Sequence, residues 1–165
     1  MFKLSFLSLL LVSSFASAEE ARRANAHVHG LNNLSMVISQ NQVAITYEMP
    51  IVQLFDEHDE HDEPTLSDES LAEFQNYSQL FALPKSANCD LVSFESGLHS
   101  VSTEGDHKDV ELAYEFSCNE PSQLKSITIN AFNRFSELET LNFEAVINNK
   151  AITKSLKSDV NKVIF

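Results

Sequence analysis

One ten-residue run, DVELAYEFSC at residues 109–118, constrains the fold more than any other stretch of the chain. Large apolar side chains occupy every second position in it, which puts Val110, Leu112, Tyr114 and Phe116 on one face. Successive side chains of a β-strand point to opposite sides, so this pattern predicts a strand with one buried and one exposed face. The chain therefore needs a sheet whose apolar side is covered.

The same alternation recurs along the chain. Residues 34–49 predict a hairpin, because two alternating stretches flank the turn sequence SQNQ and the second one ends at Pro50. Shorter stretches predict further strands, the last of them at an edge: DLVSFES at 90–96, SITINAF at 126–132, LNFEAVI at 141–147, AITKSL at 151–156 and VNKVIF at 160–165. The side chains expected to face the core are Leu34, Met36, Ile38, Val43, Ile45, Tyr47, Met49, Ile127, Ile129, Ala131, Leu141, Phe143, Ala145 and Ile147.

One helix is expected at about 67–81. Thr65 or Ser67 can cap its N-terminus, and acidic residues follow in its first turn. Its apolar residues recur at helical spacing and predict a stripe that packs on the core: Leu71, Phe74, Tyr77 and Leu80 or Phe81.

The N-terminus has the features of a secretory signal peptide. Lys3 precedes an apolar run, and the sequence ASA at residues 16–18 matches a small-x-small cleavage pattern. The run is shorter than the roughly 20 residues that cross a bilayer, so removal after Ala18 is favoured over a membrane anchor. We expect residues 1–18 to be a signal peptide and residues 19–165 to form one domain without a membrane span.

Two cysteines, Cys89 and Cys118, fit the oxidising compartment that a signal peptide leads to. Their spacing favours a disulfide, with a pair of thiolate metal ligands as the alternative. Taken together, the patterns predict an α+β fold: mostly antiparallel β-sheet with one main helix, in a single disulfide-stabilised domain.

The formal net charge of −13 excludes nucleic-acid binding through clustered phosphate contacts and favours attraction of cations. Nucleophilic catalysis has little support, because the sequence has no G-x-S-x-G and only three glycines from which to build a phosphate loop. A metal-dependent hydrolase is a lower-ranked alternative, since no H-E-x-x-H motif is present. We therefore expect a binding protein and not an enzyme.

Six histidines are the main chemical signal. His27 and His29 form H-x-H, which on a strand would place both imidazoles on one face. His107 and Asp109 repeat this spacing, on the face opposite Val110. Three imidazoles and a carboxylate suit tetrahedral zinc, whereas the alternative is four solvent-facing polar residues. His99 receives no role and is expected at the surface.

The acidic loop at residues 56–63, DEHDEHDE, carries no apolar side chain. His58 and His61 are three residues apart and could share a metal together with Asp59 and Asp62. The surrounding carboxylates attract cations but also favour protonated histidines, which do not bind metal. The stretch is consistent either with a weak secondary metal loop or with a solvated run of charge.

Several motifs together resemble one known family. HVHG at 27–30, MPIVQLFDEH at 49–58, LFALPKSANCDL at 80–91 and HKDVELAYEFSC at 107–118 occur in an order similar to that of histidine-rich periplasmic zinc-binding proteins associated with bacterial zinc uptake. The resemblance implies a periplasmic protein that captures Zn²⁺ and supplies an ABC-type zinc transporter. Ligand chemistry alone favours Cu²⁺ over Zn²⁺ at a site of this kind, so a periplasmic copper- or nickel-binding protein is an alternative.

By motif, the resemblance gives a metal-binding role to His27, His29, His107 and Asp109, and an accessory role to the loop that holds His58 and His61. Relatives carry longer histidine runs in this loop, so its capacity here is expected to be smaller. Neutral imidazole is the ligand, and affinity for zinc should therefore fall as the pH drops through about 6.5.

Overall fold

The computed structural model describes residues 31–54, 68–100 and 108–165. The expected signal peptide at 1–18 and the acidic loop at 56–63 lie outside these ranges, and both stay predictions. Among the described residues, no helix is long and apolar enough to cross a membrane.

Six strands form the larger sheet, in the order β4-β5-β2-β1-β7-β8. Neighbours pair antiparallel except β1 and β7, which run parallel. The sheet is therefore mostly antiparallel, as predicted. The parallel pair arises because β7 returns beside β1 after the chain has crossed the second layer. The strands are β1 Leu31–Ser39, β2 Gln42–Pro50, β4 Cys89–Ser100, β5 Lys108–Cys118, β7 Thr140–Ile147 and β8 Lys150–Leu156.

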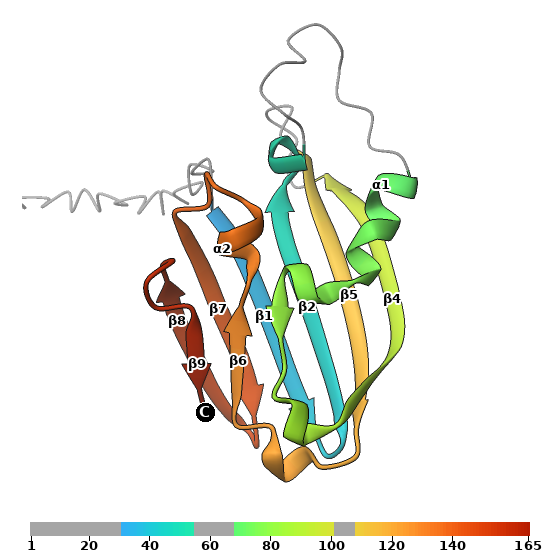
Figure 1. Ribbon diagram of the computed structural model, residues 1–165, viewed down its shortest axis with the longest axis vertical. Helices are drawn as coiled ribbons and strands as arrows, with labels where there is room; N and C mark the ends of the chain where they lie inside the picture. The colour runs from blue at the N-terminus through green and yellow to red at the C-terminus, as the bar shows by residue number, and fades with distance from the viewer. Residues whose placement is uncertain (1–30, 55–67, 101–107) are drawn as a thin grey trace, which may run out of the picture.

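A second layer covers one face of this sheet (Figure 1). It contains a three-stranded sheet, in the order β3-β6-β9, together with short helical turns. β9 lies at an edge, as the sequence predicts. The elements are η1 Ile51–Leu54, α1 Asp68–Ala72, η2 Glu73–Gln75, η3 Tyr77–Gln79, β3 Phe81–Ala82, η4 Lys85–Ala87, η5 Pro121–Gln123, β6 Ser126–Ile129, α2 Ala131–Arg134 and β9 Lys162–Ile164.

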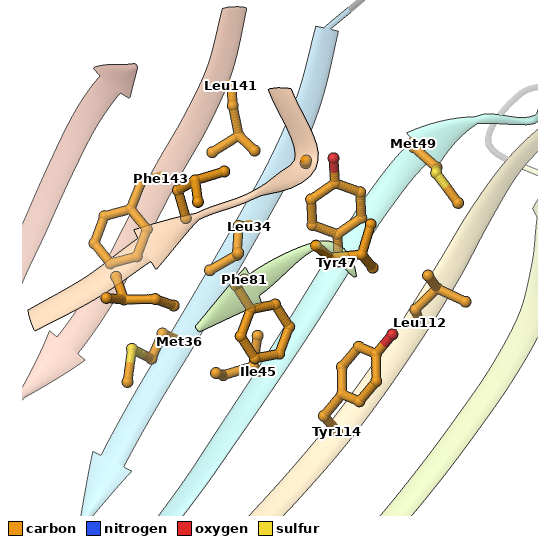
Figure 2. Close-up of a cluster of buried hydrophobic side chains, with 14 of the residues drawn as sticks. Leu34, Met36, Ile45, Tyr47, Met49, Phe81, Leu112, Tyr114, Leu141 and Phe143 are labelled. Carbon is orange, nitrogen blue, oxygen red and sulfur yellow. The ribbon is translucent and has the colours of Figure 1, made fainter. Parts of the chain in front are cut away.

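The core lies between the two layers, where the alternating residues were expected to point. Val110, Leu112, Tyr114 and Phe116 are all at most 1% exposed, which confirms the predicted buried face of β5. Figure 2 shows two of them, Leu112 and Tyr114, among side chains of the neighbouring strands and Phe81 of the second layer. Burial of roughly 25 cal/mol per Å² of apolar surface makes this contact the main source of stability.

The prediction of one main helix at about 67–81 is wrong, because only short helical segments occur between Asp68 and Gln79. The α-helix ends at Ala72, and two 3₁₀ turns follow, separated by a bend at Asn76 with ψ 73°. Leu71, Phe74 and Leu80 are buried as expected. Together with Tyr77 they recur every three residues, which matches the 3.0-residue turn of a 3₁₀-helix as well as an α-helical face, so the pattern could not separate the two.

Two strand boundaries also differ from expectation. β4 extends from Cys89 to Ser100, beyond the predicted stretch, because β5 offers it a partner along nearly its whole length. β6 ends at Ile129, and Ala131 is buried from the short helix α2 instead of from a strand. The turn follows from Asn130, whose backbone has left the extended conformation at ψ −14°.

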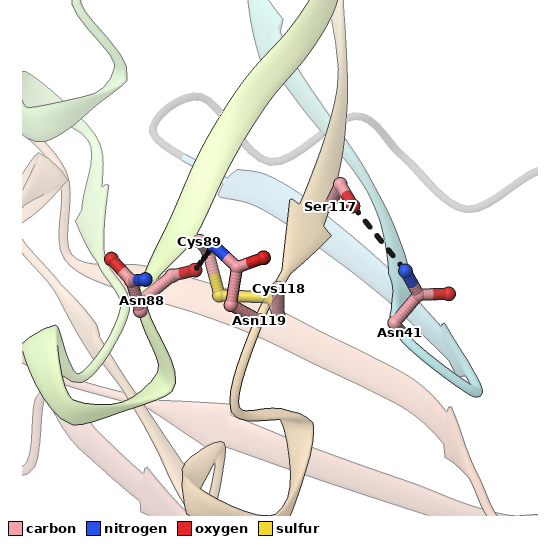
Figure 3. Close-up of a disulfide and its surroundings, with 6 residues drawn as sticks. All are labelled: Asn41, Asn88, Cys89, Ser117, Cys118 and Asn119. Atoms are coloured by element: carbon pink, nitrogen blue, oxygen red, sulfur yellow. Dashed lines mark hydrogen bonds between the residues drawn. A yellow bond between two sulfur atoms is a disulfide. The ribbon is translucent and has the colours of Figure 1, made fainter.

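The disulfide between Cys89 and Cys118 is confirmed. The two residues are direct register partners on β4 and β5 (Figure 3). Next to the disulfide, Asn88 adopts the left-handed conformation and its carbonyl accepts a hydrogen bond from the backbone N–H of Asn119 at 2.9 Å. The covalent bond therefore closes the lower end of the β4–β5 hairpin.

Replacing both cysteines by serine should lower the free energy of unfolding by about 3–4 kcal/mol, because the unfolded chain would regain the freedom of the loop between them. Urea denaturation followed by circular dichroism measures this loss. Reduction of the wild-type protein should shift its midpoint to that of the double variant. An unchanged midpoint in the variant would contradict the stabilising role of the bond.

Candidate functional site

Three stretches of the chain, 1–30, 55–67 and 101–107, lie outside the described residues. The described elements that adjoin them meet at one end of the larger sheet. β1 begins there at Leu31 and β5 at Lys108 (Figure 1). β4 ends there at Ser100, and β2 ends there at Pro50, where the chain continues into η1 and reaches Leu54. Antiparallel pairing causes this arrangement, because it puts the start of one strand beside the end of its neighbour. This end of the sheet is the candidate site.

Asp109 is the one predicted metal ligand that the structure describes. It lies on β5 and is half-buried, with Pro50 of β2 as its register partner. Glu111 shares its face of the sheet, opposite the buried Val110, as the alternation predicts. The other predicted ligands lie outside the described residues: His27, His29 and His107 of the main set, and His58, Asp59, His61 and Asp62 of the secondary loop.

His99 pairs with Asp109 in the β4–β5 register. Sequence reasoning missed this neighbour, because His99 is separated from Asp109 by nine residues and belongs to a strand predicted to end earlier. The symmetric position of the two residues in the sequence, each two positions outside the stretch 101–107, was the available signal. The pairing places a histidine position directly beside the candidate carboxylate.

Carboxylates and amides continue from Asp109 along the uncovered face of the sheet. Glu111 on β5 and Glu48 on β2 are register partners. The side-chain amide of Asn33 donates to Glu48 Oε2 at 3.4 Å and accepts from Asn142 Nδ2 at 3.3 Å. Two like charges opposite each other repel and are stabilised by a nearby cation. This part of the face favours positive ions.

The described residues alone do not complete a metal site. Across residues 31–54, 68–100 and 108–165, no three side chains of His, Cys, Asp or Glu are close enough to hold one ion. The arrangement supplies one strand-borne carboxylate next to a histidine position and an acidic face. Such groups bind zinc only when further nitrogen or oxygen ligands join them.

A buried polar network lies at the same end of the sheet, on the covered side. Asn32 is fully buried, and its amide nitrogen donates to the Tyr47 hydroxyl at 2.6 Å and to Gln53 Oε1 at 3.0 Å. Asn32 Oδ1 and Gln53 Nε2 are also buried and have no hydrogen-bond partner. Each such unpaired group costs about 1–3 kcal/mol.

Burial raises the pKa of Tyr47 above its ordinary value, and the hydrogen bond from Asn32 offsets part of the rise. The hydroxyl therefore stays protonated at neutral pH and serves as a neutral hydrogen-bonding group. Figure 2 shows this hydroxyl at the edge of the apolar cluster, pointing away from its centre. Sequence alternation predicted the burial of Tyr47 but gave no sign of its polar partners.

A comparison with curated proteins finds no match to the chain. A family model does match, over residues 26–165, and its description is ZrgA family zinc uptake protein. The match includes every described strand and the end of the sheet at which Asp109 lies. Since it covers most of the chain, the resemblance seen in the sequence motifs is confirmed, and the chain belongs to the ZrgA family of zinc uptake proteins.

Proposed function

We propose that this protein captures Zn²⁺ at the end of the larger sheet where Asp109 lies. One observation carries the proposal: the described elements that adjoin the stretches containing His27 and His29, His58 and His61, and His107 meet at this one end of the sheet (Figure 1). Family membership supports zinc as the cargo.

Covalent geometry supports His29 and His107 as ligands beside Asp109. His107 directly precedes Lys108, the first residue of β5, and His29 precedes Leu31, the first residue of β1, by two positions. Consecutive Cα atoms are about 3.8 Å apart, and neighbouring strands about 4.8 Å. Because one strand, β2, separates β1 from β5, these chain lengths suffice for the histidines to meet near Asp109.

The acidic loop serves as an accessory in this proposal. Six of its eight residues, 56–63, are acidic, and the loop joins the chain two residues after Leu54. Its negative charge raises the local concentration of cations, while its two histidines bind them weakly. The loop increases the rate of capture, and the ligands on the strands set the affinity.

The protein acts in the periplasm and passes zinc to an ABC-type uptake system. The disulfide is consistent with an oxidising compartment. The family description names zinc uptake, which requires that captured metal continue to a transporter. The activity is binding and delivery, without a chemical reaction.

Replacing His27 and His29 together by alanine should remove the tightest zinc site. The expected loss of affinity is at least about a hundredfold, because even partners that only support metal ligands contribute about 10–100-fold. Isothermal titration calorimetry with zinc and a competing chelator measures it.

The matched control is the variant in which His58 and His61 are both alanine, which also removes two histidines and should keep the tight site. If the first variant binds zinc as tightly as the wild-type protein, these ligands are wrong. A titration with Cu²⁺ and Ni²⁺ in competition tests whether zinc is the preferred ion.

Deletion of residues 56–63 should slow zinc capture and leave the affinity of the tight site unchanged. We expect about a tenfold lower association rate at low ionic strength and a smaller difference at high salt, since the effect is electrostatic. Stopped-flow fluorescence with a zinc-sensitive dye follows the rate.

A second loop variant separates charge from ligation. Replacing the six acidic residues of 56–63 by Asn and Gln keeps both histidines, and it should slow capture nearly as much as the deletion. Rates equal to that of the wild-type protein in both variants would show that the loop has no part in capture.

A further inference from the structure

Asn32 interrupts the apolar side of β1. The next residues on the same covered face, Leu34 and Met36, are apolar and buried, whereas Asn32 is fully buried and polar. Among the described residues it is the one buried polar side chain. A polar residue in such a position needs a physical reason, because an apolar one would fit the alternation and avoid the cost of desolvation.

The hydrogen bonds of Asn32 join three elements at the candidate site. Its amide nitrogen contacts Tyr47 of β2 and Gln53 of η1. Asn32 is the second residue of β1, and Gln53 is the third of the four residues of η1. The contact between them therefore fixes the place where the chain enters β1 relative to the place where it leaves η1.

Stability does not explain this network. Asn32 Oδ1 and Gln53 Nε2 are buried and unpaired, so the two amides leave one acceptor and one donor without a partner. A partly satisfied polar network is less favourable than apolar side chains of similar shape. The network instead fixes the relative orientation of the two side chains, because a hydrogen bond requires a particular distance and angle between its two groups and apolar contact does not.

We propose that Asn32 and Gln53 are positioning residues for zinc capture. Their contact holds the start of β1 and the end of η1 in one fixed relation at the end of the sheet where Asp109 lies. The inference rests on the proposed function. With the start of β1 and the end of η1 already fixed, zinc binding has to remove less conformational entropy from the chain. Neither residue touches the metal.

The test replaces the two amides with apolar side chains of similar length and measures zinc affinity and stability separately. Gln53→Met removes the amide of the half-buried partner, and Asn32→Leu removes the amide of the fully buried one. We expect each variant to bind zinc about tenfold more weakly, at the lower end of the range for groups that support metal ligands. The double variant should be no weaker than the singles, since either change breaks the same contact.

Stability measured without metal provides the second readout. Thermal unfolding in chelator should show Gln53→Met about as stable as the wild-type protein, because the change removes the unpaired Gln53 Nε2 but takes a partner from the Asn32 amide. Weaker zinc binding then cannot be attributed to unfolding. Gln53→Met keeps the test valid even if Asn32→Leu, at the more crowded position, fails to fold.

The matched control is Asn41→Ala. This substitution also removes one side-chain amide, whose hydrogen bond runs to Ser117 Oγ at 3.4 Å at the opposite end of the sheet. Its zinc affinity should stay within about twofold of the wild-type value, because Asn32 keeps its contact with Gln53. Wild-type affinity in Gln53→Met and Asn32→Leu would overturn this inference alone. A wild-type protein that binds no zinc would overturn the proposed function and the inference with it.

Discussion

Burial of one face of the six-stranded sheet is the constraint on which the rest of this structure depends. Phe81 of the second layer packs edge-on against Tyr114 of the sheet, with ring centroids 5.3 Å apart, and Tyr77 packs in the same way on Phe116 at 4.8 Å. Edge-to-face contacts of this kind add to the apolar area that they bury. They hold short helical turns and two- to four-residue strands against the sheet, although these pieces are too short to be stable alone.

The same constraint determines where the candidate site lies. A one-residue slip of any strand would turn its apolar face outward, so burial fixes the register. With the register fixed, His99 is opposite Asp109, and Asp109 is opposite Pro50. The starts of β1 and β5 and the ends of β4 and η1 then lie together at one end of the sheet. A protein that must gather ligands from separate parts of its chain gains from this arrangement, since the scaffold brings their attachment points together before metal binds.

Much of this fold could be predicted from the sequence, because a period of two is a direct consequence of strand geometry. The buried faces of β1, β2, β5 and β7 follow from it, and so does the position of Asp109 on the face opposite Val110. The helix at 67–81 could not be predicted reliably, since spacing by three fits both helix types. His99 and Gln53 were missed for another reason: their importance comes from pairing and contact across the fold, which local patterns do not contain. The ligand roles of His27, His29 and His107 stay predictions.

We propose that zinc binds at the end of the sheet formed by the start of β1, the end of η1 and the β4–β5 pair near Asp109. Amide chemical shifts recorded by NMR during a zinc titration of the wild-type protein would locate the bound ion. We expect the largest changes at Leu31, Asn32, Leu54, His99 and Asp109, with little change at Ser39, Gln42 and Cys118 at the opposite end. Changes concentrated at that opposite end, or along the edge strand β8, would contradict it.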